Sequence, residues 1–276
     1  MADVILTGAS RGIGRALALR VASTGRASRM VLVARDRTRL ESLVADIERL
    51  GGRAIAVCGD LSSLAGAEAL GRQLSGIVNR DTTLIHNAGL WPSKRVLTPD
   101  GLESAFVVNH LAPLRMQESL IAAGQVRRVL VIGAGLMIKG RFDRGRTPTG
   151  EDFSSLRTYC NTKLCFALAM RDIAAVHPEL DVLVVHLGVV RTDLGARRGP
   201  IGWVLWLVKQ FWERPEVSAE RLYRILAKDR WSPPGDALWF FEDKEQPWPA
   251  VACNEDTRAQ YVRLRNDCSV RITPEP

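Results

Sequence analysis

A tyrosine and a lysine stand four residues apart in the run YCNTK, residues 159–163. Residues i and i+4 of a helix lie on one face, so Tyr159 and Lys163 would point the same way. A free phenol has a pKa of about 10, and a nearby ammonium favours the phenolate, so the pair could exchange a proton near neutral pH. The same spacing also occurs in simple surface pairs, so the role depends on the surroundings.

The elements that must position this pair alternate between strand and helix. Near-continuous apolar runs rich in Val and Ile predict strands buried on both faces. Between them lie helical spacings, such as the one over 37–50 that Gly51 ends. The pattern predicts an α/β fold: a Rossmann-type doubly wound parallel sheet of about seven strands, with helices on both faces. The predicted strands cover residues 3–7, 30–34, 54–57, 83–86, 129–132 and 182–187.

Length and composition indicate one soluble domain over residues 1–276, with 46% hydrophobic and 25% charged residues. The N-terminal run lacks the basic region of a secretion signal, so a cytoplasmic protein is expected. Five scattered cysteines form no C-x-x-C pair, which argues against a metal or redox site. The net charge of +8 is interspersed with Asp and Glu, so no nucleic-acid partner is expected.

A glycine-rich stretch, TGASRGIG, follows the first predicted strand and opens a helical run. Such glycines let the backbone turn tightly and approach a pyrophosphate at the positive end of the helix. A plain tight turn is the alternative, but the junction of strand and helix favours a dinucleotide site. At the end of the second strand, an acidic residue would hold the ribose of NAD and an arginine the 2′-phosphate of NADP. Arg35 stands there, with Arg11 nearby and Asp36 next to it, so NADP(H) is predicted.

Taken in order, these motifs resemble the short-chain dehydrogenase/reductase family. The resemblance rests on TGASRGIG (7–14), Asp60, HNAG (86–89), VNH around Asn109, YCNTK and LGVVRT (187–192), and covers about residues 3–192. The C-terminal region is similar to the retinol dehydrogenase-like and light-dependent protochlorophyllide reductase-like branch. The resemblance implies a catalytic set of Tyr159, Lys163 and Asn109. The cofactor residues are Gly8, Ser10, Arg11, Gly12, Ile13, Gly14, Arg35, Asp60, Leu61, Asn87, Ala88, Gly89, Tyr159, Lys163, Val190 and Thr192.

The resemblance also implies a role for each catalytic residue. Tyr159 would protonate a carbonyl oxygen, or deprotonate an alcohol, while the nicotinamide gives or takes hydride. Lys163 would activate Tyr159 and hold the nicotinamide ribose, and Asn109 would anchor a water that relays protons to solvent. The resemblance therefore predicts an oxidoreductase.

The largest departure from the family pattern lies at the end of the fifth strand. The run VLVIGAGLMIKG places Gly133 and Ala134 where the family has two serines, and Ala134 stands where a serine helps hold the substrate oxygen. Removing one such donor lowers the rate by about 10²–10³. Thr158, Ser154, Ser155 or the substrate could supply a hydroxyl, or the substrate could depend less on that donor. Otherwise the protein binds NADP(H) without redox chemistry.

Residues 195–230 are expected to form a substrate-covering lid. Their run IGWVLWLVKQFW (201–212) is apolar nearly all round and shorter than the about 20 residues that span a bilayer. A core helix and a shallow membrane-surface contact are alternatives. Trp203 and Trp206 are therefore assigned, with Ala134, to the substrate side of the site.

The predicted function is that of an NADP(H)-dependent ketoreductase or alcohol dehydrogenase. Its substrate would be a hydrophobic, aromatic or polycyclic small molecule, with secondary metabolism as a candidate context. A homodimer or homotetramer is expected by family analogy, without stable membrane insertion. The alternative is a protein of the same fold that binds NADP(H) for non-redox chemistry or for an accessory or sensor role.

Overall fold

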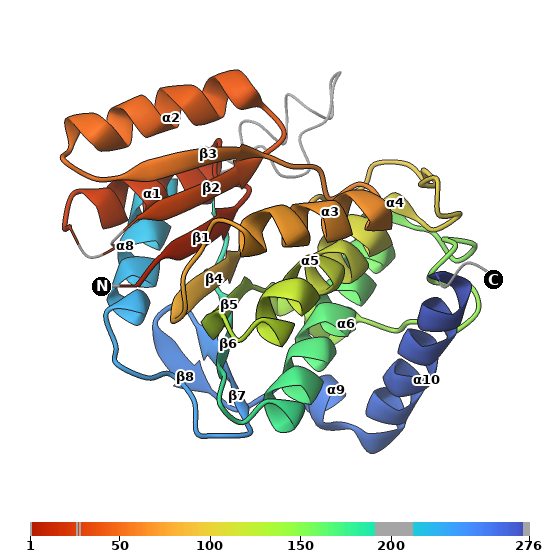
Figure 1. Cartoon of the computed structure of the whole chain (residues 1–276). Helices are drawn as coiled ribbons and strands as arrows, with labels where there is room; N and C mark the ends of the chain where they lie inside the picture. Colours follow the sequence, from red (N-terminus) through yellow and green to blue (C-terminus); the bar gives the residue numbers. More distant parts are fainter. Residues whose placement is uncertain (1, 26, 28, 191–211, 273–276) are drawn as a thin grey trace.

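The computed structural model describes residues 2–25, 27, 29–190 and 212–272. Within this part, eight strands form one sheet in the order β3-β2-β1-β4-β5-β6-β7-β8 (Figure 1). The strands are β1 Val4–Thr7, β2 Met30–Ala34, β3 Ala54–Cys58, β4 Thr82–His86, β5 Val126–Ile132, β6 Asp181–His186, β7 Ala237–Phe241 and β8 Lys244–Gln246. All neighbours pair in parallel except β7 and β8, which form an antiparallel edge. The predicted doubly wound parallel sheet is confirmed, with one short strand added.

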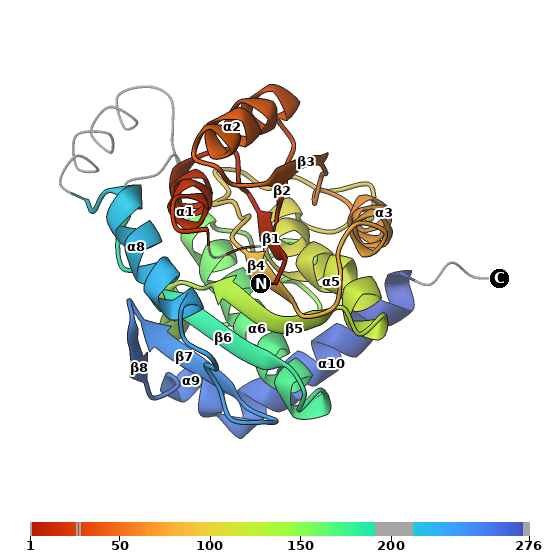
Figure 2. The same ribbon diagram turned by 60° about the vertical axis from the view of Figure 1, so that its left-hand side comes forward.

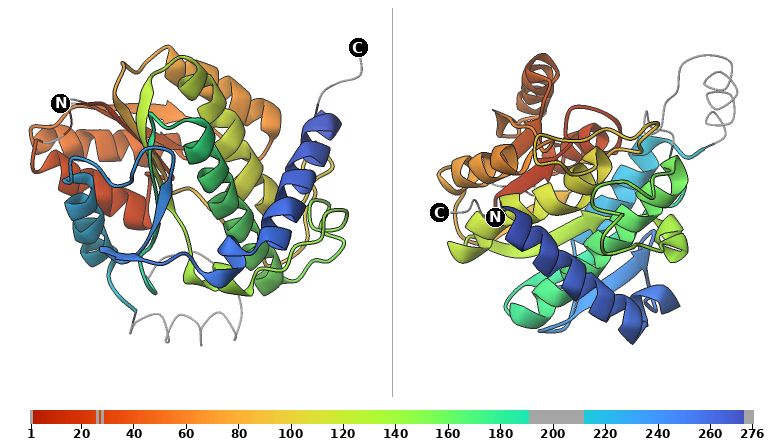
Figure 3. Two further views of the ribbon diagram at one scale, coloured as in Figure 1. Left: turned by 90° about the horizontal axis from the view of Figure 1, so that it is seen from below. Right: turned by 90° about the vertical axis from the view of Figure 1, so that its right-hand side faces the viewer.

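Helices cover both faces of the sheet (Figures 1 and 2). One face carries α1 Gly12–Ala22, α2 Arg37–Arg49 and α8 Pro215–Leu226. The other carries α3 Leu64–Ser75, α5 Ala112–Ala122 and α6 Ser155–Val176. The C-terminal helix α10 Glu255–Ile272 lies outside α6 (Figure 3). The remaining helical turns are α4 Ser104–Phe106, the π-helical η1 Val107–Leu111, the 3₁₀ turn η2 Gly135–Lys139 and α9 Ala250–Cys253.

The central strands are mostly apolar because they are buried on both sides. In β1, Ile5 belongs to the core beneath α3, α5 and α6, and Leu6 belongs to the core beneath α1, α2 and α8. Successive strand residues point to opposite faces, so a strand between two helix layers favours apolar residues on both sides. None of the helices in the described part of the chain combines the length and apolar character needed to cross a membrane.

Local sequence fixes where the helices begin and end. Asp36, Ser63 and Ser154 cap α2, α3 and α6, each accepting a hydrogen bond from a main-chain N–H three residues later. Such caps satisfy donors that the first helical turn leaves without partners. At the far end of α2, Gly51 adopts a positive φ of 80°, as expected for a glycine that ends a helix. The Ser154 cap matters most here, because α6 carries Tyr159 and Lys163.

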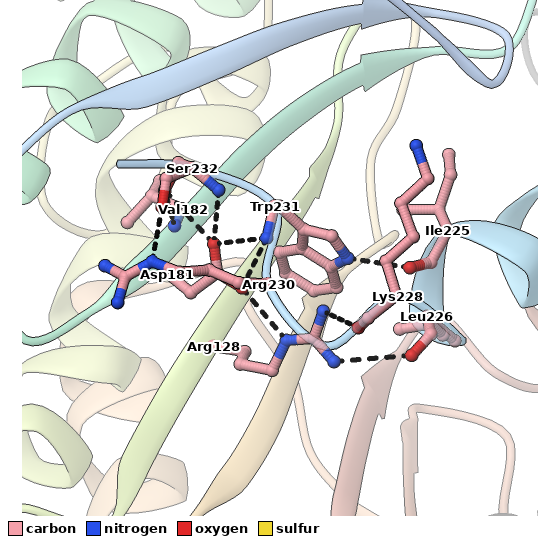
Figure 4. Close-up of polar contacts among 9 residues, drawn as sticks. All are labelled: Arg128, Asp181, Val182, Ile225, Leu226, Lys228, Arg230, Trp231 and Ser232. Atoms are coloured by element: carbon pink, nitrogen blue, oxygen red, sulfur yellow. Dashed lines mark hydrogen bonds and ion pairs between the residues drawn. The ribbon is translucent and has the colours of Figure 1, made fainter. Parts of the chain in front are cut away.

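A buried carboxylate ties α8 to the amino end of β6 (Figure 4). Asp181 accepts hydrogen bonds from the main-chain N–H groups of Trp231 (2.9 Å) and Ser232 (2.8 Å), and Arg128 Nε donates to it at 3.2 Å. The same guanidinium lies 3.8 Å from the Trp231 ring centroid and donates to the carbonyl of Leu226 at the end of α8. One charge pair therefore fixes the connection that follows α8.

Val190, which follows β6, and Glu213, which precedes α8, meet at the carboxyl edge of the sheet. Val190 forms an isolated parallel bridge with Glu213, whose carboxylate accepts from Arg221 of α8 at 2.5 Å. Of the predicted lid, residues 195–211 lie outside the described residues, and 215–226 form α8. Because α8 packs against α1, with Arg20 donating to Glu220 at 2.5 Å, it belongs to the helix layer of the sheet.

Candidate active site

A cavity of about 580 Å³ lies at the carboxyl ends of β1, β2, β4 and β5. Ligands of doubly wound sheets bind at this edge. Gly14, Asn109 and Ala134 do not line the cavity, and Val190 lies at the bridge to Glu213. Thr192, Trp203 and Trp206 lie outside the described residues. The predicted residues that do line it are Gly8, Ser10, Arg11, Gly12, Ile13, Arg35, Asp60, Leu61, Asn87, Ala88, Gly89, Tyr159 and Lys163.

The HNAG turn holds the glycine loop in place. Asn87 Nδ2 donates to the carbonyls of Thr7 (3.0 Å) and Gly8 (3.1 Å), and Thr7 Oγ1 accepts from the N–H groups of Asn87 and Ala88, each at 3.1 Å. A Cβ at Gly14 would lie 2.4 Å from the Gly8 carbonyl oxygen, and Gly8 has a positive φ of 66°. These two positions therefore require glycine for contact and for conformation.

The start of α1 fits an anionic group. Gly12, with φ 55°, opens the helix at the cavity wall, and its first turn has no acidic residue. Among the described residues, no side chain caps this end of the helix. The helix N-terminus carries partial positive charge and main-chain donors, so it suits the pyrophosphate of a dinucleotide.

The other end of the cavity is cationic. Arg35 and Arg39 both line it and are exposed. Asp36 is occupied elsewhere: it caps α2 by accepting from the N–H of Arg39 at 3.0 Å, and its other oxygen lies 3.1 Å from Arg39 Nε. Because its carboxylate caps α2 and pairs with Arg39, Asp36 competes little with a phosphate for the cationic side chains. The sequence analysis did not assign Arg39 to the cofactor site, although an arginine in the first helical turn after the second strand could have indicated that role.

Tyr159 and Lys163 lie on one face of α6, as the spacing predicted. Both are buried, and Lys163 Nζ lies 6.0 Å from the Tyr159 ring centroid while donating to the Ile132 carbonyl at 2.8 Å. Burial lowers the pKa of Lys163 to about 8 and raises the pKa of Tyr159 above its ordinary value. The expectation of a lowered phenol pKa is therefore wrong for this structure, because burial removes the solvent that would stabilise the phenolate.

Asn109 is buried in the π-helical turn η1 and fixes the main chain beside the cavity. Its Oδ1 accepts from Leu90 N at 2.8 Å, and its Nδ2 donates to Leu90 O at 2.8 Å and to Thr162 Oγ1 at 3.1 Å. Such π-helical turns are frequent at functional sites. The predicted residue is therefore present at the site, and its amide holds the loop after HNAG.

Trp91 is a site residue that sequence reasoning missed. Its indole lies parallel to the Tyr159 ring, with centroids 4.4 Å apart and an interplanar angle of 6°. Its Nε1 donates to Ser155 Oγ at 3.0 Å. Of the hydroxyls predicted to replace the missing serine, Ser155 therefore accepts from an indole, and Ser154 accepts from Arg157 N as the α6 cap.

Close packing requires glycine on either side of Ala134, at positions 133 and 135, but not at position 134 itself. A Cβ at Gly133 would lie 2.9 Å from Val184 Cγ1, and one at Gly135 would lie 2.7 Å from His186 Nε2. Ala134 itself is buried and precedes η2. The side chains of β6 therefore exclude serine at the flanking positions, and position 134 offers no hydroxyl.

His86, the first residue of HNAG, does not behave as a base. Its ring is buried, Nε2 lies 2.8 Å from Gln117 Oε1, and burial lowers its pKa to about 4. A histidine with such a pKa has little affinity for a proton at physiological pH, so it is a weak base. Tyr159 is therefore the better candidate for proton exchange.

Comparisons with known proteins agree with this geometry. The family profile described as short chain dehydrogenase matches residues 2–140. A Streptomyces sp. (strain C5) protein, provisionally named daunorubicin C-13 ketoreductase DnrU, is 30% identical over 229 residues, 81% of this chain and 77% of its own. Human retinol dehydrogenase 13 is 28% identical over 278 residues, covering 94% of this chain and 81% of its own.

A solved structure shares the fold. The alcohol dehydrogenase of the archaeon Thermococcus sibiricus, complexed with 5-hydroxy-NADP, superposes with a TM-score of 0.63 at 23% identity, over 90% of this chain and 99% of its own. The profile covers half of the chain, and the Streptomyces relative is similar over most of both chains. This chain therefore belongs to the short-chain dehydrogenase/reductase family of oxidoreductases and is similar to its retinol dehydrogenases.

Proposed function

We propose that the protein is an NADP(H)-dependent oxidoreductase that interconverts a ketone and an alcohol on a hydrophobic, aromatic or polycyclic small molecule. One observation carries the proposal: Tyr159 and Lys163 line the same cavity as the glycine loop and Arg35. The name of the Streptomyces relative and the ligand of the archaeal dehydrogenase support it. We also propose that the protein is cytoplasmic and that it forms a homodimer or homotetramer.

The residues present fit NADP(H). Arg35, Arg39 and Arg11 would hold the 2′-phosphate, and the start of α1 would hold the pyrophosphate. Lys163 would hold the nicotinamide ribose hydroxyls. When bound, the cofactor supplies or accepts the hydride.

The protein's own contribution is a proton. In the reducing direction, Tyr159 donates its hydroxyl proton to the carbonyl oxygen as that oxygen gains charge, so an uncharged phenol is the form needed at the start. Burial keeps the phenol in that form. The Lys163 ammonium, 6.0 Å from the ring centroid, then stabilises the phenolate left behind. We further propose that Asn109 anchors the water through which Tyr159 regains its proton.

Ala134 favours a second candidate function, in which NADP(H) binds without redox chemistry in an accessory, sensor or rearrangement role. Fluorescence titration with NADPH and NADP⁺, followed by NADPH oxidation assays over a panel of aromatic and polycyclic ketones, separates the two. Tight binding together with NADPH oxidation supports the oxidoreductase. Tight binding without oxidation of any ketone would favour the second candidate, and failure to bind would exclude both.

Arg35→Ala should weaken NADPH binding and leave NADH binding nearly unchanged. A charge-assisted hydrogen bond is worth about 1.5–3 kcal/mol, so the Kd for NADPH should rise about 10–100-fold. Titration of the variant with both dinucleotides measures the difference. The control is Arg37→Ala, because Arg37 is exposed, lies outside the cavity and lies near Glu41. Equal losses for NADPH and NADH would contradict the assignment of the phosphate site.

Ala134→Ser should raise the rate of ketone reduction. One donor aimed at a developing oxyanion contributes about 10²–10³ in rate, and we expect the added hydroxyl to recover at least about tenfold of it. Gly135→Ser is the matched comparison, and it should destabilise the fold because its Cβ would meet the His186 ring. Steady-state kinetics and thermal melts of both variants measure this. An unchanged kcat in a folded Ala134→Ser variant would mean that another group already holds the substrate oxygen.

A further inference from the structure

The indole of Trp91 covers one face of the Tyr159 phenol. The two rings are parallel to within 6°, their centroids lie 4.4 Å apart, and Tyr159 is only 6% exposed. Stacked aromatic pairs have a preferred geometry, so such a neighbour restricts the rotation and tilt of the phenol. The position of the reacting hydroxyl therefore depends on the position of the indole.

The indole is itself held by the helix that carries Tyr159. Trp91 Nε1 donates to Ser155 Oγ at 3.0 Å. Ser155 lies four residues before Tyr159 on α6, so its side chain is on the same helix face. The hydrogen bond therefore fixes the plane of the indole relative to the plane of the phenol.

A second set of contacts holds the main chain next to Trp91. Leu90 is bound through both its N–H and its carbonyl by the Asn109 amide, each at 2.8 Å. That amide also donates to Thr162 Oγ1 at 3.1 Å, and the Thr162 hydroxyl donates to the Tyr159 carbonyl at 2.9 Å. The contacts thus form a closed loop that starts at the Tyr159 ring and returns to its main chain.

We propose that Trp91 is a positioning residue for Tyr159 and restricts how the substrate reaches it. Ala134 has no hydroxyl with which to orient the phenol or the substrate oxygen, and a ring stacked on the phenol supplies that orientation instead. Because the indole covers one ring face, the substrate carbonyl meets the hydroxyl from the uncovered side. Only the kinetic consequence of this inference rests on the proposed function.

Tyrosinate titration tests the inference without any substrate. The chain has three tyrosines, and subtracting the ultraviolet titration curve of a Tyr159→Phe partner isolates Tyr159 in each background. Removing the indole in Trp91→Ala admits water to the phenol, so the pKa of Tyr159 should fall by about one unit or more. Trp91→Phe, which keeps a stacked ring, should stay near the wild type.

Leu156→Ala is the control for general loosening of this helix turn, because Leu156 is on α6 and 45% exposed. Far-ultraviolet circular dichroism checks that each variant is folded over the titrated range. Coincident Tyr159 curves for wild type and Trp91→Ala would overturn the inference. An equal shift in Leu156→Ala would overturn it as well.

Kinetics provide the second readout. Small misplacements of a reacting group lower rates by up to about 100-fold, so Trp91→Ala should lower kcat about 10–100-fold, with recovery in Trp91→Phe. The Kd for NADPH should stay within about twofold, because Trp91 does not line the cofactor cavity. A wild-type chain that reduces no ketone would refute the proposed function, whereas the titration would still decide the role of Trp91.

Discussion

Tyr159→Phe is expected to lower kcat for ketone reduction by about 10²–10⁴ while leaving the Kd for NADPH within about threefold. The substitution removes one hydroxyl and keeps the ring that stacks on Trp91 at 4.4 Å, so packing at the site should persist. A loss of kcat without a loss of NADPH binding would therefore measure the contribution of proton donation by Tyr159. Steady-state kinetics with the most reactive ketone of the panel, together with fluorescence titration of NADPH, measure the two quantities.

The matched control is Tyr223→Phe. Tyr223 lies on α8 beneath the Arg20 guanidinium, outside the cavity, so kcat should stay near that of the wild type. A Tyr159→Phe variant that is as active as its parent would remove Tyr159 from the reaction. Loss of activity accompanied by loss of NADPH binding would instead indicate a collapsed site.

Asp181→Ala is expected to be the most destabilising single change outside the site. Asp181 is 5% exposed and accepts from Arg128, Trp231 and Ser232, so its removal takes the counter-charge from a partly buried guanidinium and leaves two buried main-chain donors without their acceptor. Breaking a buried pair from one side lowers the free energy of unfolding by about 3–5 kcal/mol. For a domain of this size, Tm should fall by roughly 6–20 °C.

Glu68→Ala is the control, because it removes an exposed partner of Arg72 on α3. Exposed pairs contribute about 0–1 kcal/mol, so its Tm should hardly change. Thermal and urea unfolding measure both variants. Similar Tm values for Asp181→Ala and wild type would mean that the other contacts of Arg128 and Trp231 are enough to hold the connection after α8.

Most strands of the fold could be predicted because their residues are buried one after another, which gives continuous apolar runs in the sequence. The runs at 30–34 and 54–57 coincide with β2 and with most of β3, and the run at 129–132 is the carboxyl half of β5. No position was predicted for β7 or β8. The parallel partner of β7 is β6, which lies about fifty residues earlier, so local periodicity does not reveal the pairing.

The candidate site was predictable where chemistry lies in local spacing. The glycine loop and the Tyr159–Lys163 pair each fall within a few residues, and both line the cavity. Trp91 was missed because its partner Tyr159 is 68 residues away and no local pattern marks a stack. The direction of the Tyr159 pKa shift was wrong for a related reason, since burial depends on the whole fold.

The bridge between Val190 and Glu213 has a consequence for how the family can diversify. Val190 and Glu213 pair with each other, and Glu213 also accepts from Arg221, so none of these contacts depends on the number of residues between the two positions. Doubling the length of a closed loop costs only about 0.6 kcal/mol. Substitutions or insertions between these two residues, in evolution or by a protein engineer, would therefore leave the contacts of Val190, Glu213 and Arg221 in place.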